Sequence, residues 1–461
     1  MRTIALLPEL LVGGGALALV IAGRLRSLPT RWLAAGALLL AVAALALELW
    51  LGAQIGTLFS GGWQQDRFSL FAKAALLVAL AGLLATSDWS AETLPDVLPF
   101  AFLAVFGGMV VASATSLPGL WAGLELAALS GVAAGGLASR ETGLRLLTVS
   151  ALAGGLITVG FGFLYAVTGA STLSGLRQTL VNEPVTLALA LIALLPLTGV
   201  VIRLGLSPFQ PAAAGGVVLG AMGAAVLTGL TAGAAALALV KLLAAMYGAN
   251  PAWGLWLAAL ASFAMVLGGL RALGVASPRP LVAWLVVQQV GWLAGGLATH
   301  DQRGTAAALF LLVPLLLGAT AGPLLAGGPD GPLSRITGLG RREPARAMGL
   351  ALVLLSLAGV PPLAGFFGEF TVAVELVRSG LVWVLACGLL GSLLCTAAVV
   401  RSLRLLYLEL TPEESRGTVS RRNVSWKAGP FVPAVLVLAY GLLANPIHSL
   451  AVQGAAALGL H

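Results

Sequence analysis

Apolar runs long enough to cross a membrane follow one another along almost the whole chain. A membrane-spanning helix needs about 20 consecutive, mostly apolar residues. The pattern predicts 14 spans, which together make an all-α polytopic membrane protein. Their predicted ranges are 4–23, 31–51, 69–86, 96–114, 117–137, 143–168, 185–222, 223–247, 252–274, 280–299, 304–327, 346–380, 381–403 and 429–447.

Spans seven and twelve are predicted to be broken helices, because prolines interrupt apolar runs that continue beyond them. Span seven contains PLTGVVIRLGLSPFQPAA (196–213), and span twelve contains LSLAGVPPLAGFFGEFTVAVEL (355–376). Proline removes a backbone hydrogen bond, and in lipid the freed carbonyls need protein or water as partners. Two breaks five spans apart indicate two inverted five-helix repeats, spans 4–8 and 9–13, with a polar site near the middle of the membrane. Ordinary proline kinks are the alternative.

This reading divides a single membrane domain, residues 1–461, into four parts. Residues 1–95 form the first three helices, 96–247 the first repeat, 252–403 the second repeat, and 404–461 a polar loop and the last helix. No long soluble segment interrupts the series.

Four ionisable residues lie inside predicted spans, where a charge is costly and usually marks an ion or proton route. They are Glu125, Arg203, Lys241 and Glu369. Glutamate and lysine can release or bind a proton when buried, whereas arginine stays charged. The alternative for Arg203 and Lys241 is that they extend their charged ends to the membrane surface. Weaker candidates for the same route are Lys73, Arg145, Gln288 and Gln289.

Composition supports a membrane protein and indicates its orientation. The chain is 59% hydrophobic and 9% charged, with a formal charge of +8 and a mean hydropathy of +1.01. Basic residues collect in cytoplasmic loops. Of the 25 Lys and Arg residues, 17 fall in loops of one side, 5 on the other, and the rest in spans. This predicts an inner-membrane protein with both termini outside. Without a basic patch interleaved with aromatics, we expect no nucleic acid partner.

The sequence predicts no metal site and no cofactor in this chain. Cys387 and Cys395 form no CxxC pair and are too few for a cluster or a structural zinc. The three histidines, His300, His448 and His461, are predicted to lie in loops or at the terminus, so they offer no paired haem ligands inside the membrane. Any redox chemistry is therefore expected in other subunits.

Several stretches resemble the antiporter-like membrane subunits of respiratory complex I, a family related to the Mrp cation/proton antiporters. The stretches are SLPGLWAGLELAALSG (116–131), ETGLRLLTVSALAGGLITVGFGFLYAVTGA (141–170), VIRLGLSPFQP (201–211), VVQQVGWLAGGL (286–297), and ITGLGRREP followed by LSLAGVPPLAGFFGEF. The resemblance covers nearly the whole chain and is closest to subunit N. It implies lipids, other membrane subunits, further antiporter-like subunits and a peripheral redox arm as partners, with flavin, iron–sulfur clusters and quinone in those partners.

The resemblance also implies roles for individual residues. Glu125 matches the glutamate of span five, which in the family pairs with a basic residue of span seven, here Arg203 instead of the usual lysine. Lys241 matches the central lysine of span eight. Glu369 stands where subunit N usually has lysine, and a glutamate there resembles subunit M instead. Gln289 replaces a histidine often found in span ten. The polar stretch usual after the span-seven break is replaced by AAAGGVVLGAMGAA (212–225).

Four functions therefore remain open at this stage. The first is a proton-translocating subunit of a complex I-type NADH:quinone oxidoreductase. The others are a subunit of a cation/proton antiporter, the equivalent subunit of a membrane-bound hydrogenase, and a scaffold that does not pump. The departures at Arg203 and Glu369 make pumping by a modified route the main question.

Overall fold

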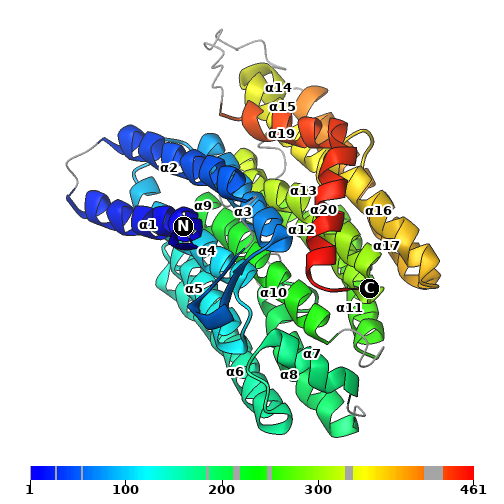
Figure 1. Ribbon diagram of the computed structural model, residues 1–461. Coiled ribbons are helices and arrows are strands. Elements are labelled where there is room, and N and C mark those ends of the chain that lie inside the picture. The colour runs from blue at the N-terminus through cyan, green and yellow to red at the C-terminus, as the bar shows by residue number, and fades with distance from the viewer. Residues whose placement is uncertain are drawn as a thin grey trace.

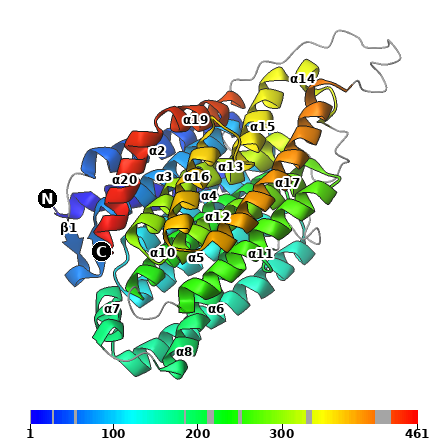
Figure 2. The ribbon, with the colours of Figure 1, turned by 90° about the vertical axis from the view of Figure 1, so that its right-hand side faces the viewer.

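A computed structural model describes residues 2–25, 29–52, 56–182, 186–210, 219–246, 252–327, 336–409 and 429–460. Within these ranges the chain is a bundle of roughly aligned helices with one small hairpin of two strands (Figures 1 and 2). Both ends of the chain lie beside this hairpin, at the same end of the bundle (Figure 2). We call this the hairpin end.

Three helices and the hairpin form the N-terminal part of the bundle, in which α2 (Thr30–Leu51) packs against both α1 (Leu7–Leu25) and α3 (Arg67–Thr86). The strands pair antiparallel, with Leu58 opposite Trp63. Asp66 caps α3 by accepting a hydrogen bond from the Ser69 amide at 2.7 Å. The elements are η1 (Arg2–Leu6), α1 (Leu7–Leu25), α2 (Thr30–Leu51), β1 (Gly56–Leu58), η2 (Phe59–Gly61), β2 (Trp63–Gln65) and α3 (Arg67–Thr86).

The next group of helices corresponds to the predicted first repeat. Glycines let α4 and α5 approach closely: a Cβ on Gly107 would lie 2.6 Å from the Gly123 carbonyl oxygen, as is common for helices packed in lipid. The helices are α4 (Leu94–Ser113), α5 (Leu117–Gly136), α6 (Arg140–Thr168), α7 (Leu173–Asn182), α8 (Leu187–Leu204), α9 (Ala221–Ala225) and α10 (Ala232–Ala245). The π-helical segment η3 (Val226–Thr231) joins α9 to α10.

The following helices correspond to the predicted second repeat, in which α13 is the most central. It packs against α3, α12, α15, α16 and α20, and nearly all its side chains are buried. The helices are α11 (Ala252–Gly274), α12 (Pro278–Ala298), α13 (Gln302–Ala326), α14 (Leu339–Arg342), α15 (Pro344–Leu357), α16 (Ala364–Arg378) and α17 (Val382–Tyr407).

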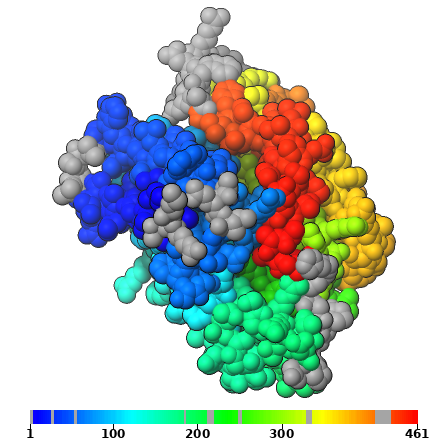
Figure 3. Space-filling model, in the orientation of Figure 1, coloured from blue at the N-terminus to red at the C-terminus, as the bar shows by residue number. Residues whose placement is uncertain are grey.

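The chain ends in two helices joined at a sharp bend. They are α19 (Phe431–Leu442) and α20 (Ala444–Ala457), and the angle between them is 80°. α20 packs on α3 and α13, and Figure 3 shows it in red between the blue N-terminal helices and the yellow C-terminal ones. His448 therefore lies within a helix, where its ring meets Phe310 at 5.4 Å. The prediction of a loop at this residue was wrong.

The predicted polytopic all-α fold is confirmed. Twelve helices of the described chain are long and apolar enough to cross a membrane, and the bent α19–α20 pair makes a thirteenth candidate. Span twelve is present as two shorter helices, α15 and α16, separated by residues 358–363. The division into two inverted repeats stays a prediction.

Three details differ from the predicted spans. Residues 221–222, assigned to span seven, begin the helix that continues through η3 into α10. α7, which precedes α8, was not predicted because it is amphipathic and short. Span seven breaks after Leu204, at Gly205, which has a positive φ of 73°; residues 211–218 of its predicted second half lie outside the described residues.

Candidate functional site

The first predicted pair is formed: the Arg203 guanidinium on α8 donates a hydrogen bond to Glu125 on α5. Nη2 lies 2.6 Å from Oε1. The Arg203 side chain is 3% exposed and that of Glu125 is 22% exposed. Nε and Nη1 of Arg203 are buried and have no hydrogen-bond partner in the described chain. The carboxylate of Glu125 is therefore the main compensation for a fixed buried charge.

A glycine of α6 makes room for this pair. A Cβ on Gly154 would lie 2.7 Å from Glu125 Oε1 and 2.8 Å from Arg203 Nη2. Distances this short do not occur for real side chains, so any larger residue would displace the carboxylate, the guanidinium or both. Three helices thus define the position of the pair: two carry the charges, and the third approaches them because it has no side chain there.

Lys241 on α10 is also buried in the bundle. Its Nζ donates a hydrogen bond to the Ala114 carbonyl oxygen at 2.6 Å and lies 5.5 Å from the centre of the Phe68 ring. Ala114 follows the last residue of α4, so this carbonyl is free of the helical ladder. No carboxylate pairs with Lys241 among the described residues. The Lys241 ammonium is therefore held by one carbonyl and one ring face.

Glu369 on α16 accepts hydrogen bonds at both carboxylate oxygens. Gln289 Nε2 donates to Oε1 at 2.5 Å, and Ser392 Oγ donates to Oε2 at 2.7 Å. The serine oxygen itself accepts bonds from Gln288 Nε2 at 2.8 Å and Trp292 Nε1 at 3.0 Å. This arrangement fixes the serine as a donor to Glu369. Two neutral donors, and no cation of the described chain, therefore hold the Glu369 carboxylate.

The break in span twelve positions this carboxylate. Gly359, in the segment between α15 and α16, has a φ of 70°, and a Cβ there would lie 2.5 Å from Glu369 Oε2. The Leu357 carbonyl at the end of α15 accepts a hydrogen bond from Gln289 Nε2 at 2.8 Å. As predicted from the prolines, a carbonyl freed at the break is hydrogen-bonded by a polar side chain from another helix.

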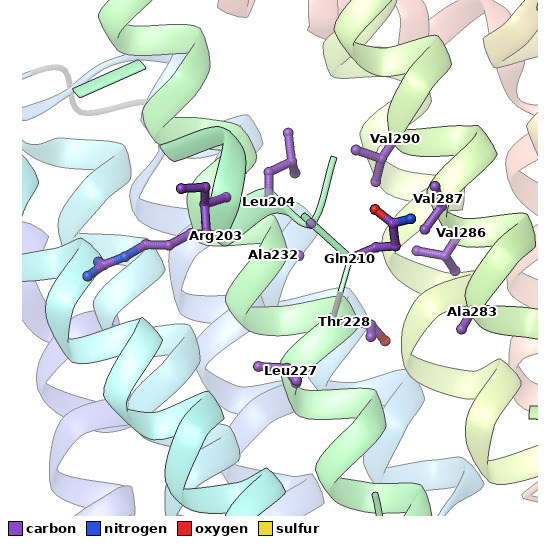
Figure 4. Close-up of a pocket in the computed structure, with 12 residues that line it drawn as sticks. Arg203, Leu204, Gln210, Leu227, Thr228, Ala232, Ala283, Val286, Val287 and Val290 are labelled. Atoms are coloured by element: carbon purple, nitrogen blue, oxygen red, sulfur yellow. The ribbon is translucent and has the colours of Figure 1, made fainter. Parts of the chain in front are cut away.

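A cavity of about 60 Å³ lies between the two halves of the bundle. One buried water needs roughly 15 Å³ of such space, so the cavity has room for a few. Figure 4 shows the guanidinium of Arg203 turned away from it, while the Gln210 amide points toward the valines of α12. Gln210 Oε1 is buried without a hydrogen-bond partner in the described chain. Gln210 and Thr228 supply its polar side chains, and Val286, Val287 and Val290 supply much of its apolar wall.

The weaker candidates lie in different places. Gln288 and Gln289 join the Glu369 network, as described above. Arg145 lies on the surface, 55% exposed, and pairs with Glu141 one turn earlier on α6 at 2.5 Å. The structure does not bring Arg145 to the buried residues. Lys73 is fully buried, and it meets two carboxylates, Glu9 and Glu48, whose role sequence reasoning missed. Glu9 and Glu48 were not predicted as its partners because each lies near an end of its apolar run.

His300 occupies the turn between α12 and α13. Burial lowers its pKa, opposed by a hydrogen bond with the Met246 backbone and by the nearby Asp301 charge. The described residues contain no group of three or more His, Cys, Asp or Glu side chains arranged to hold a metal ion.

Comparison with known families decides the class of protein. The family model described as "NADH:quinone oxidoreductase/Mrp antiporter, TM" matches residues 114–395, more than half of the chain. The chain belongs to this NADH:quinone oxidoreductase/Mrp antiporter family. The matched region contains Glu125, Arg203, Lys241 and Glu369. It excludes α1, α2 and α3 and therefore Lys73.

Relatives and solved structures agree with this antiporter-like family. The chain is 30% identical to NADH-quinone oxidoreductase subunit N of Methylobacterium nodulans, over 87% of this chain and 88% of the relative. A chain of respiratory complex I from Thermus thermophilus superposes with a TM-score of 0.79 at 22% identity, covering 96% of this chain and 98% of that one. A chain of the Mrp complex from Dietzia superposes with a TM-score of 0.83 at 19% identity, covering 99% and 98%. The two superpositions show a shared fold.

Proposed function

We propose that this chain is a proton-translocating membrane subunit, the subunit N type, of a respiratory NADH:quinone oxidoreductase. The observation that carries the proposal is the presence of three separate ionisable sites inside one apolar bundle: Glu125 with Arg203, Lys241, and Glu369 with its network. Buried ionisable groups in membrane spans are expensive and usually serve transport. The named relatives favour the complex I assembly.

Each site has a distinct task in this proposal. Glu125 exchanges a proton while Arg203 stays charged. Protonation of Glu125 therefore leaves the positive charge of Arg203 uncompensated, and this charge repels further protons along the route. Lys241 carries a proton between the halves and the hairpin end. Glu369 alternates between a carboxylate held by two donors and a protonated acid that needs no counter-charge. The side chains only hold and move protons; oxidation of NADH and reduction of quinone belong to partner subunits.

The cavity provides the connection between the two halves. The valines of α12 offer protons no hydrogen-bond partner. Waters between Gln210 and Thr228 would supply the missing partners and so let protons cross the cavity. Because most of the lining is apolar, the connection depends on water entering, which would let the charge state of the neighbouring sites control it. The other membrane subunits of the complex would cover the exposed apolar faces of the bundle that lipid does not.

The experiment is mass spectrometry of the proteins that copurify with this chain from gently solubilised membranes. Flavin and iron–sulfur subunits with an NADH site are the expected result. A set of small membrane subunits without any redox protein would instead support a cation/proton antiporter, which the superposition on the Mrp complex chain also fits. Hydrogenase subunits would place the chain in that related class.

A further inference from the structure

Three ionisable side chains from the three N-terminal helices meet inside the bundle at the hairpin end. Lys73 on α3 forms an ion pair with Glu9 on α1, and its Nζ lies 4.0 Å from Oε1 of Glu48 on α2. The side chains of Lys73, Glu9 and Glu48 are 0%, 5% and 1% exposed. We call these three residues the N-terminal cluster. It lies outside the matched family region.

The hairpin fixes the position of the ammonium within the cluster. Gln65 on β2 accepts a hydrogen bond from Lys73 Nζ at 2.6 Å and donates one to Glu48 Oε1 at 2.6 Å. The Trp63 ring on the same strand lies 4.8 Å from Nζ. Lys73 is therefore held by a carboxylate, an amide and a ring face, and it has no access to the membrane surface.

The charges of the cluster do not balance. Two carboxylates face one ammonium, so the cluster carries one negative charge when all three groups are ionised. Glu9 Oε1 contacts the Lys73 ammonium, whereas Glu9 Oε2 and Glu48 Oε2 are buried and make no hydrogen bond within the described chain. A buried uncompensated charge costs several kcal/mol, and a buried acid commonly avoids this cost by taking up a proton.

Among the side chains that the structure describes, no other cation forms an ion pair with the cluster. Ionisable groups on the three helices and on the elements packed around them are Arg24 on α1, Arg31 on α2, Asp66 and Arg67 at the start of α3, Asp96 on α4, Lys241 on α10, Arg303 on α13, Tyr440 on α19 and His448 on α20. None of them forms an ion pair with Glu9 or Glu48. Asp96 lies in the first turn of α4, at the opposite end of the bundle from the hairpin.

We propose that the N-terminal cluster holds one exchangeable proton, bound by Glu48, and exchanges it with the hairpin end of the membrane domain. A proton balances the charge where a metal ion would not fit. The Lys73 ammonium already occupies the space between the carboxylates, and a second cation would meet its charge directly. The atom that binds the proton is Glu48 Oε2, which is buried and has no hydrogen-bond partner in the described chain.

The position of Lys241 indicates when the proton leaves. The Ala114 carbonyl that accepts the Lys241 hydrogen bond belongs to a residue paired with Trp63 in a β-bridge, and the Trp63 ring faces Lys73. When Lys241 binds a proton, the added positive charge favours the ionised cluster, so the cluster releases its proton. The timing of release rests on the proposed function, whereas the presence of a bound proton in the cluster is argued independently of it.

The test is infrared difference spectroscopy of the purified full-length chain in lipid nanodiscs, following the carbonyl band of protonated carboxylic acids. Glu48→Gln and Glu9→Gln each balance the cluster without a proton, so each variant is expected to lose the band of one acid. Glu375→Gln is the matched control, because Glu375 has its own ion pair with Arg378 at 2.6 Å, and this substitution is expected to leave the band unchanged. An unchanged band in both single variants would overturn the proposal.

Two further variants keep the test decisive if a glutamine variant folds poorly. Lys73→Met removes the ammonium, so the band is expected to grow by one acid. The double variant Glu9→Gln/Glu48→Gln leaves Lys73 uncompensated and is expected to unfold at a lower temperature than either single variant. Equal unfolding temperatures for the single and double variants, together with no growth of the band in Lys73→Met, would contradict the proposal.

Proton pumping by the assembled complex separates this inference from the proposed function. Glu48→Gln is expected to lower the number of protons moved per NADH while NADH oxidation continues. If Glu125→Gln and Glu369→Gln pump normally, the proposed function fails, whereas the infrared result still decides the cluster. If they fail to pump but Glu48→Gln pumps like the parent, the cluster plays no part in translocation.

Discussion

Replacing Glu125 with glutamine tests whether the buried pair with Arg203 is the energetic centre of the first half. The substitution keeps the size of the side chain and removes the negative charge. Arg203 cannot lose its proton and its side chain is 3% exposed, so its charge would remain in the bundle without a counter-charge. We expect Glu125→Gln to destabilise the protein substantially.

The magnitude follows from the geometry of the pair. Removal of one partner from a buried ion pair costs about 3–5 kcal/mol. The Glu125 side chain is 22% exposed, so water compensates part of the loss and about 3 kcal/mol is the expected cost. The double variant Glu125→Gln/Arg203→Met buries no charge. It should recover most of that stability while still failing to pump, because recovery of stability does not restore the proton carrier.

A double-mutant cycle measures this coupling directly. The free energy of unfolding of the purified chain in mixed micelles is followed for the parent, Glu125→Gln, Arg203→Met and the double variant. A coupling energy of about 2–3 kcal/mol is expected. A coupling below about 0.5 kcal/mol, the size of additivity errors, would refute the interpretation of the pair as mutually compensating buried charges.

Three further predictions concern room and charge at the other sites. Gly154→Ala places a methyl group against the Glu125 and Arg203 side chains and should lower the free energy of unfolding by about 1–3 kcal/mol. The adjacent Gly155→Ala has open space around it and should lower it less. Equal losses of stability in the two variants would contradict this interpretation. Gly359→Ala and Gly380→Ala both strain a backbone with positive φ, but only the alanine at position 359 would meet a carboxylate, that of Glu369. Proton pumping in vesicles should therefore fall in Gly359→Ala and not in Gly380→Ala. Lys241→Met should abolish proton pumping, while native gels should show that the complex still assembles. Normal pumping by this variant would show that Lys241 is not part of the proton route.

Hydropathy and proline positions predict most of the fold because both act locally along the chain. Apolar runs of about 20 residues specify the spans, and the prolines of span twelve indicate a break that the structure places between α15 and α16. The π-helical segment η3 could not be predicted in this way, since its packing against α13 depends on close approach: a Cβ on Gly229 would lie 2.3 Å from Thr320.

The candidate site was predicted residue by residue but not as a set of contacts. A charge in the middle of an apolar run is unusual enough to single out Glu125 and Glu369. Which groups meet depends on helix packing, so the sequence did not show that Ser392 and Gln289 bind Glu369. The N-terminal cluster was missed because Glu9 and Glu48 lie near span ends, where charges usually reach the membrane surface.

The most direct test of the account measures protons moved per NADH oxidised in sealed vesicles that contain the assembled complex. The account predicts that Glu125→Gln and Glu369→Gln each lower this ratio, while Glu141→Gln, which alters an exposed pair on α6, leaves it unchanged. If both Glu125→Gln and Glu369→Gln keep the parent ratio, the buried ionisable groups do not carry protons, and the central claim is wrong.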